Sequence, residues 1–311
     1  MLDKNRPRLF SFGNCDLADI LDNDFFYRDF VMMRQRTKGY VEDSLDFREC
    51  TQPIWATSLL SLYTEPGSIA QRVYETLAGL KTRNAVQLNA YKEIAKYPYL
   101  KYWKENVGPN DYLAISFSTE MCTKILFQNE CWTAITQLKK LSDPDDALHW
   151  LYSDYMTKDV YQLSFDTTES LDQTKECLLQ FAKDVYDIFQ DRVIVVKTHL
   201  SDLLITADHR VEKVKLGAES NLLFFKKTKL MGTPLDEKYV QKVTNVIAWK
   251  FCREYKTDIP LIELNEPVFV DANHRWGYGP SHLDRISCFK IGKLVHAELM
   301  KKVNENKILI V

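Results

Sequence analysis

Short apolar runs alternate with longer amphipathic stretches along the chain. Residues 9–12 form an apolar run that ends at Gly13 and Asn14, and residues 16–21 then repeat apolar side chains at helical spacing. This order predicts a strand, a tight turn and a helix. Further runs with the composition of buried strands occupy residues 112–117, 161–165, 193–197 and 260–264.

Helical patterns lie between these runs. Residues 170–189 and 236–255 repeat apolar side chains every three or four positions, which is typical of amphipathic helices. Strands that alternate with helices predict a parallel sheet covered on both faces. We therefore expect an α/β fold, a three-layer sandwich with a parallel central sheet, in a single domain over residues 1–311.

Two features interrupt this alternation. Residues 210–216 alternate apolar and polar side chains, and residues 222–225 form another apolar run after a polar turn. This pattern predicts a β-hairpin insertion within residues 208–232. The aromatic-rich segments 91–103 and 132–155 predict helical excursions from the sheet.

Composition narrows the class of protein. Hydrophobic residues make up 45% of the chain and charged residues 27%, which is enough apolar material for a folded core. The formal charge is −2, from 41 Lys and Arg against 43 Asp and Glu, so nucleic acid is not an expected partner. No apolar run is long enough to span a membrane, and residues 1–12 lack the apolar region of a signal peptide.

Cysteine usage indicates the compartment. The seven cysteines are scattered and none is part of a CxxC pair, which favours neither a disulfide scaffold nor a zinc site. We expect a reduced, cytoplasmic protein without a metal or cofactor.

The first candidate for chemistry is Gly13-Asn14-Cys15-Asp16-Leu17. A nucleophile between a strand and a helix gains backbone donors for an oxyanion, and the helix dipole lowers the pKa of a thiol there. The structural alternative is a buried cysteine that only packs. The sequence alone leaves both interpretations open.

The second candidate is the segment 268–282. An apolar run leads there into a loop that contains Asp271, His274 and His282. A carboxylate three residues before an imidazole can hold that ring in the orientation a general base needs. The alternative is a helix cap at Asp271 with a surface histidine.

Together these two segments resemble the SGNH/GDSL-like hydrolase superfamily. In that superfamily a Gly-Asp-Ser turn after a strand carries the nucleophile, and an Asp-x-x-His segment near the C-terminus carries the other triad members. Residues 13–17 match the first block with Cys15 in the serine position, and residues 271–274 match the last. The chain is similar, more closely still, to an uncharacterised bacterial family often encoded among capsule and surface-polysaccharide genes. That family opens with Gly-Ser-Cys and closes on His-x-Trp-Gly-x-x-Pro-x-His, a pattern that residues 274–282 follow.

The resemblance implies a catalytic site of Cys15, His274 and Asp271. The expected oxyanion donors are the N–H of Cys15 and, from its surroundings, Asn14 or Ser58. We therefore expect an acyl esterase or acyltransferase that uses an acyl donor and acts on a carbohydrate, such as a surface-polysaccharide precursor. The residues expected to bind substrate are Asn14, Ser58, Trp276, Tyr278 and His282.

The chain departs from the bacterial family at three positions. Trp55 or Ala56 stands where the family has a basic residue, Met121 replaces an arginine, and Asn14 replaces a serine. These changes affect the anion-binding side chains of the family. The alternative function is accordingly a non-catalytic carbohydrate-binding or accessory protein of a polysaccharide or glycosylation system.

Overall fold

In the computed structural model the chain folds into two compact units. The first consists of Met1–Met32, Pro109–Met121 and Phe189–Val311, and the second of Met33–Gly108 and Cys122–Ile188. The described residues are 6–33, 45–46, 54–55, 57–77, 81–82, 98–121, 124–127, 130–133, 143–145, 148–151, 153–154, 161–163, 168–213, 237–254, 259–274 and 281–309.

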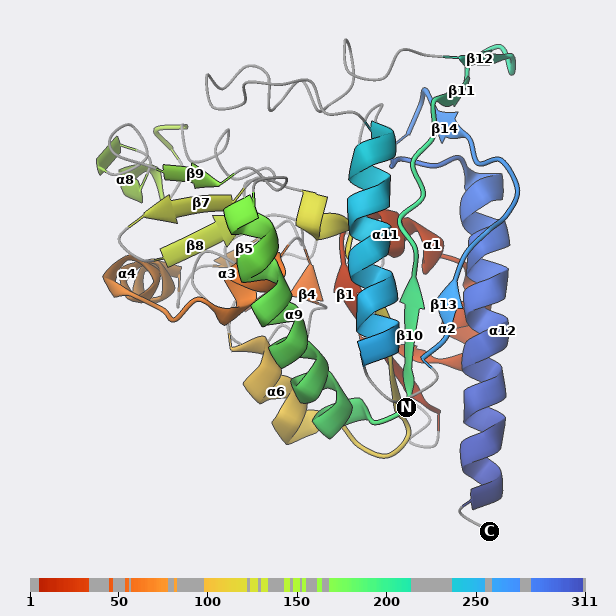
Figure 1. The fold of residues 1–311 in the computed structure, drawn as a ribbon, viewed down its shortest axis with the longest axis horizontal. Helices are drawn as coiled ribbons and strands as arrows, with labels where there is room; N and C mark the ends of the chain where they lie inside the picture. The colour runs from red at the N-terminus through yellow and green to blue at the C-terminus, as the bar shows by residue number, and fades with distance from the viewer. Residues whose placement is uncertain are drawn as a thin grey trace. The chain divides into compact units, whose positions relative to one another are not determined.

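Five parallel strands form the central sheet of the first unit (Figure 1). They are β1 (Arg8–Gly13), β2 (Val31–Met32), β6 (Asp111–Ile115), β10 (Val193–Val196) and β13 (Leu261–Ile262). The order across the sheet is β13-β10-β6-β1-β2, and each neighbouring pair is parallel. Because the chain moves from β1 outward to β2 and then back to β6 on the other side, the strand order reverses between β1 and β6. Open α/β sheets bind ligands at such a switch point, beyond the carboxyl ends of the strands.

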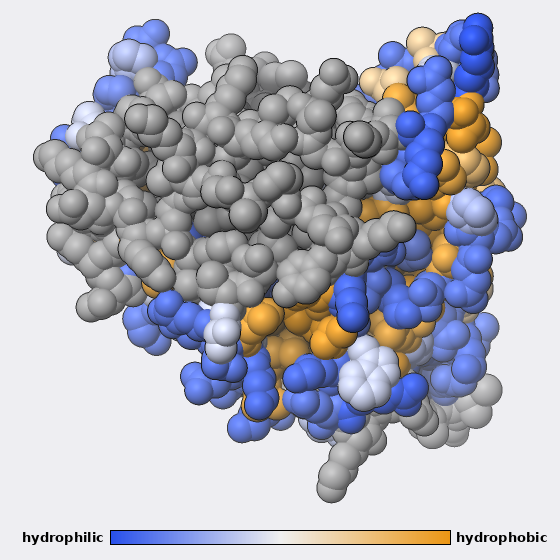
Figure 2. All heavy atoms as spheres, turned by 45° about the horizontal axis from the view of Figure 1, so that its top comes forward, coloured by the Kyte–Doolittle hydropathy of each residue, from blue (hydrophilic) through white to orange (hydrophobic). Residues whose placement is uncertain are grey.

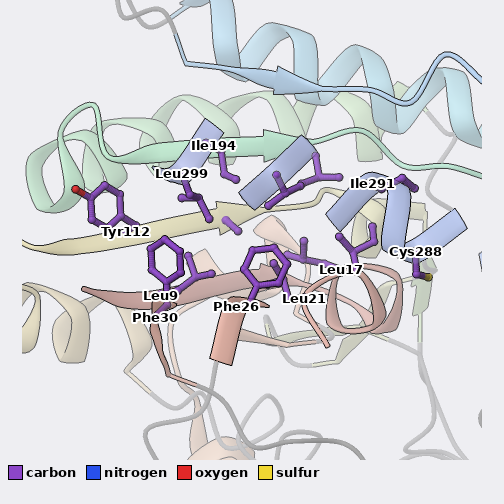
Figure 3. Packing of buried hydrophobic residues seen from close by; sticks show 14 of the residues in the cluster. Leu9, Leu17, Leu21, Phe26, Phe30, Tyr112, Ile194, Cys288, Ile291 and Leu299 are labelled. Atoms are coloured by element: carbon purple, nitrogen blue, oxygen red, sulfur yellow. The ribbon is translucent and has the colours of Figure 1, made fainter. Parts of the chain in front are cut away.

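Helices cover both faces of this sheet, as the sequence predicted. On one face, α1 (Cys15–Ile20), α2 (Asp24–Asp29) and α12 (Arg285–Leu309) pack on alternate strand residues such as Leu9, Tyr112 and Ile194 (Figure 3). The other face carries Phe12, whose ring meets that of Phe117. Phe117 in turn meets Phe251 of α11 (Glu237–Glu254), with ring centroids 5.3 Å apart. Burial of each such side chain contributes about 1.5–3 kcal/mol.

A smaller sheet of the first unit supports the loop before α12. It contains β11 (Leu203–Ile205), β12 (Val211–Lys213) and β14 (Val270–Asp271). β12 pairs antiparallel with β11, whereas β14 runs parallel to β11. Of the range predicted to form a hairpin, residues 208–232, β12 is a strand, but it pairs with β11 outside that range. The predicted second arm, residues 222–225, lies outside the described residues, so the hairpin stays a prediction.

The second unit holds an antiparallel sheet of β7 (Lys124–Phe127), β8 (Glu130–Thr133) and β9 (Tyr161–Leu163), in the order β8-β7-β9. The strand predicted over residues 161–165 thus forms, but in this sheet rather than the parallel one. The helix expected from residue 132 is wrong at its start, because Trp132 pairs with Ile125 within β7 and β8. The remaining short strands are β3 (Leu45–Asp46), which pairs with β5 (Lys81–Thr82), and β4 (Ile54–Trp55).

The helices of the second unit are short except for one. They are α3 (Leu59–Tyr63), α4 (Ser68–Leu77), α6 (Tyr99–Asn106), α8 (His149–Leu151) and α9 (Thr168–Phe189). The buried Glu130 carboxylate accepts the N–H groups of Ile69 and Ala70 and so caps the start of α4. The two predicted helices at residues 170–189 and 236–255 correspond to α9 and α11.

Candidate active site at the end of β1

Cys15 lies at the carboxyl end of β1, where the chain turns into α1. Gly13, just before this turn, is closely packed against Leu17 of α1, since a Cβ atom there would lie 3.0 Å from Cδ2 of Leu17. A Cβ atom on Gly13 would lie 3.2 Å from Cβ of Ser116. The Cys15 N–H donates to Oδ1 of Asn14 at 2.8 Å, so the predicted backbone oxyanion donor is already engaged. The thiol itself is partly exposed.

His282 is the imidazole that meets the Cys15 thiol. The distance from Sγ of Cys15 to Nε2 of His282 is 3.4 Å, which is within hydrogen-bonding reach for sulfur. His282 lies in the segment just before α12. Sequence reasoning placed this residue in substrate binding and gave the base role to His274.

His274 stacks on His282 and contacts a different carboxylate from the one expected. The two imidazole rings lie 4.7 Å apart between centroids at an interplanar angle of 14°. Nε2 of His274 lies 3.1 Å from Oδ2 of Asp19, and both side chains are less than a tenth exposed. Asp19 follows Cys15 by four residues in α1, so the two share one face of the helix. This i, i+4 spacing was the signal in the sequence that could have identified Asp19.

Asp271 has a local role in the backbone. Its Oδ1 accepts the N–H of Asn273 at 2.8 Å, and its main-chain carbonyl accepts the N–H of His274 at 3.2 Å. Both contacts belong to a turn that an aspartate side chain closes. The structure thus brings the Asp271 backbone to His274, while the carboxylate beside the His274 ring is that of Asp19.

Asp16 is a second acidic group at the switch point. Its carboxylate accepts hydrogen bonds from the hydroxyl of Ser116 at 2.9 Å and from that of Ser118 at 2.7 Å. All three residues are buried. Burial raises the pKa of the Asp16 carboxyl above its usual value of 3.8, and the serine hydrogen bonds oppose this rise. Asp16 therefore links the turn after β1 to the segment after β6.

The remaining predicted substrate-binding residues are Ser58, Trp276 and Tyr278. Ser58 is the N-terminal cap of α3 in the second unit, where its hydroxyl accepts the N–H of Ser61 at 3.3 Å. Trp276 and Tyr278 lie outside the described residues, as does Ala56. Their predicted roles stay predictions.

Two further residues of reactive type, Cys252 and His199, are held in structural roles. Burial raises the pKa of the Cys252 thiol to about 12, which makes it a poor nucleophile. His199 follows β10, and its Nε2 accepts the N–H of Leu264 at 3.1 Å. Burial lowers the pKa of His199, so this ring is a neutral link between the ends of β10 and β13.

Neither a metal site nor a membrane span is found in the described ranges. No three His, Cys, Asp or Glu side chains among these residues converge as metal ligands. None of the helices formed there is long and apolar enough to cross a bilayer. The described surface drawn in Figure 2 is mainly hydrophilic, with apolar patches between polar groups. The exposed Trp249 and Ile286 lie on α11 and α12, which cover opposite faces of the sheet, so they do not form one patch.

Comparisons with known protein families, curated proteins and solved structures find no match for this chain.

Proposed function

We propose that this protein is a cysteine-dependent acyl esterase or acyltransferase with an SGNH-like α/β core. The observation that carries the proposal is the 3.4 Å contact between Sγ of Cys15 and Nε2 of His282 at the sheet's switch point. A thiol next to an imidazole is an activated nucleophile, and thiolates form thioesters readily. By contrast, burial raises the pKa of the Cys252 thiol to about 12.

The acyl transfer takes place in two steps, acylation of Cys15 and then deacylation. The thiol proton passes to Nε2 of His282, and the Cys15 sulfur attacks the acyl carbon while the carbonyl electron pair moves to oxygen. When the carbonyl re-forms, the leaving group departs and takes the proton from His282. In the second step His282 accepts a proton from water or an acceptor hydroxyl, whose oxygen attacks the thioester. The Cys15 thiolate then leaves and recovers its proton from His282.

His274 and Asp19 hold His282 in place. The His274 ring stacks flat on His282, and Asp19 fixes the His274 ring through Nε2. The carboxylate thus acts on the general base through a second imidazole. In a serine triad the carboxylate bonds the general base directly, whereas Asp19 contacts only the ring that stacks on it, so its loss should cost less turnover than in those triads.

The carbohydrate acceptor in this proposal comes from the sequence resemblance alone. The family similarity at residues 13–17 and 274–282 points to surface-polysaccharide precursors as the acceptor class. The chemistry of the site itself fits any acyl donor whose carbonyl reaches Cys15. A sugar hydroxyl and water differ only as the second nucleophile, so one site accommodates both hydrolysis and transfer.

Covalent labelling with p-nitrophenyl acetate tests the nucleophile. We expect peptide mass spectrometry to find one acetyl group on Cys15, and Cys15→Ala to release no nitrophenolate above buffer. His282→Gln should slow acetylation by about 10²–10⁴-fold. Cys177→Ala, which removes another partly exposed thiol, should behave as wild type. Added monosaccharides should speed deacylation if a sugar is the acceptor.

Unchanged nitrophenolate release in Cys15→Ala would refute this function. The accessory carbohydrate-binding function would then take its place, and binding of the same monosaccharides without turnover would support it.

A pair of isosteric variants tests which carboxylate serves the site. We expect Asp19→Asn to lower the acetylation rate, because the contact with Nε2 of His274 loses its charge, but by less than the loss of a carboxylate that bonds the general base itself. Asp271→Asn should keep the rate, since an asparagine oxygen can accept the same N–H of Asn273. The reverse result would return the carboxylate role to Asp271.

A further inference from the structure

We propose that the outer face of α11 docks this protein on an anionic lipid surface, lying on the bilayer rather than crossing it. This inference goes beyond acyl transfer and does not depend on it. It rests on a row of exposed side chains that we call the α11 stripe: Lys242, Val246, Trp249 and Arg253.

The side chains of the α11 stripe lie in one line along the helix. They follow one another at intervals of four, three and four residues, so each lies about one turn beyond the last on the same face. Val246 and Trp249 are 45% and 53% exposed, and the cations Lys242 and Arg253 are exposed at the two ends. The opposite face of α11 packs on the sheet through buried side chains such as Phe251. The stripe therefore belongs to the surface and not to the core.

The charges of the α11 stripe are not neutralised within the described part of the chain. No ion pair or hydrogen bond there joins Lys242, Arg253 or the neighbouring Lys250 to a carboxylate, and the indole of Trp249 meets no other ring. The helix contains four Lys and Arg against two Glu, a net charge of +2 in a chain whose formal charge is −2. The stripe thus combines an apolar centre with cations that are open to an anionic partner.

Two other helices expose apolar side chains in a different electrostatic setting. α9 exposes Leu179, but that helix contains five Asp and Glu against two Lys. α12 exposes Phe289, but Lys293 lies over its ring at 4.9 Å from the centroid, and Lys290 donates to Glu266. An anionic partner is therefore favoured at α11 over these two faces.

The chemistry of the stripe favours lipid over a sugar or a protein. Lys, Trp and Arg side chains donate hydrogen bonds and accept none, so the stripe has no acceptor for sugar hydroxyls. A stable protein interface buries about 800 Å² on each partner, whereas this stripe is about 16 Å long and one helix wide. At a lipid surface the indole occupies the headgroup level, the valine enters the apolar boundary, and the cations reach anionic headgroups.

Docking through the α11 stripe leaves the proposed active site uncovered. Oδ1 of Asn245 accepts the N–H of Thr198 at 3.0 Å, and Nε2 of Gln241 donates to the Thr198 carbonyl at 3.2 Å. Thr198 follows the carboxyl end of β10, so the Lys242 end of the stripe lies at the carboxyl edge of the sheet (Figure 1). Cys15 follows β1 at the same edge, while the stripe faces outward from the helical layer.

Flotation of the full chain with lipid vesicles tests the docking. One set of vesicles contains equal parts of phosphatidylglycerol and phosphatidylcholine, and the other contains phosphatidylcholine alone. We expect the protein to float with the anionic vesicles at about 0.05 M salt and to lose most of that binding at about 0.5 M, because salt screens the cations. We expect no binding to phosphatidylcholine alone.

Two variants of the α11 stripe separate its apolar and charged parts. Trp249→Ser should weaken binding about tenfold, because the indole no longer enters the interface. Lys242→Gln combined with Arg253→Gln should weaken it about 25-fold, since each cation near an anionic surface contributes about fivefold. All three side chains are exposed, so the fold does not depend on them.

Matched controls make the same changes on α9. Leu179→Ser removes an exposed apolar side chain, and Lys175→Gln combined with Lys183→Gln removes two exposed cations. Both controls should bind the anionic vesicles as wild type does, because neither touches the α11 stripe.

The possible failures are distinguishable. The docking role is wrong if wild type binds neither vesicle or both equally, or if the α9 controls lose as much binding as the α11 variants. Binding to polyglutamate but not to the vesicles would overturn the lipid proposal and assign the stripe to an acidic protein. Acetylation of Cys15 by p-nitrophenyl acetate should be the same in the α11 variants as in wild type. A protein that floats but is never acetylated retains the docking role and loses the proposed function.

Discussion

Asp16 offers a direct test of how the switch point is held together. Its carboxylate accepts two hydroxyl hydrogen bonds, from Ser116 and Ser118, which are 1% and 0% exposed. Asp16→Ala leaves both hydroxyls without this acceptor. At about 1–3 kcal/mol for each of the two unsatisfied buried groups, we expect a loss of about 2–6 kcal/mol in the free energy of unfolding.

Asp16→Asn should cost less, about 1 kcal/mol, because an amide can accept from one serine and donate to the other. The cost should also depend on pH. Burial raises the pKa of Asp16 in the folded protein above 3.8. A raised pKa means that the contribution of this group is fully present below 3.8 and is lost as pH rises through the folded-state value. Asparagine has no such dependence, so the deficit of Asp16→Asn relative to wild type should shrink as pH rises.

Urea unfolding of wild type, Asp16→Ala and Asp16→Asn at several pH values, from around 4 to around 7, measures both effects. Asp22→Asn removes a charge at the end of the same helix and controls for changes in net charge. A deficit of Asp16→Asn that grows with pH would contradict the direction of the pKa shift. Wild-type stability in Asp16→Ala would contradict the role of Asp16 as a link between the two strand ends.

Three other predictions concern stability. Gly292→Ala places a Cβ 2.9 Å from the Ile20 carbonyl, so overpacking of about 1–3 kcal/mol should outweigh the gain of about 1 kcal/mol in helix propensity and lower the melting temperature. The pKa of Asp29 is lowered to about 2, mainly by its hydrogen bond with Arg28 and also by its contact with His296 of α12. Its contribution is present above about 3.8 and is lost as pH falls towards 2, so Asp29→Asn should destabilise the protein at neutral pH and lose that effect in acid. Glu130→Gln should weaken the cap of α4 by about 1 kcal/mol and accelerate hydrogen exchange of its first amides.

The parallel sheet was predictable because its strands carry their signal locally. Residues 193–196 form an uninterrupted run of valine and isoleucine, which is typical of a strand buried on both faces. The antiparallel sheet of the second unit gave a weaker signal. Its strand at Glu130–Thr133 mixes a buried carboxylate with a cysteine and a tryptophan, and that pattern does not separate a strand from a helix.

The candidate site could be predicted as a pair of segments but not as a set of contacts. Cys15 and the loop around His274 were both found from the sequence, because each follows an apolar strand. Which histidine meets the thiol depends on the path of the loop, and two imidazoles eight residues apart are equivalent in sequence terms. Asp271 was attractive for its spacing to His274, yet the same spacing also suits a turn, which is what the structure contains.

The geometry of α1 matches the stack of two histidines at this site. Side chains at positions i and i+4 of a helix lie on one face, with about 5–6 Å between their Cβ atoms. Cys15 and Asp19 have this spacing, and the stacked rings that meet them are 4.7 Å apart. The separation of the two side chains along one turn of helix therefore matches the separation of the two stacked rings. The thiol lies opposite His282 and the carboxylate opposite His274. In a serine triad one imidazole bonds both the nucleophile and the carboxylate, whereas here each of the two stacked rings contacts one of them, His282 the thiol and His274 the carboxylate.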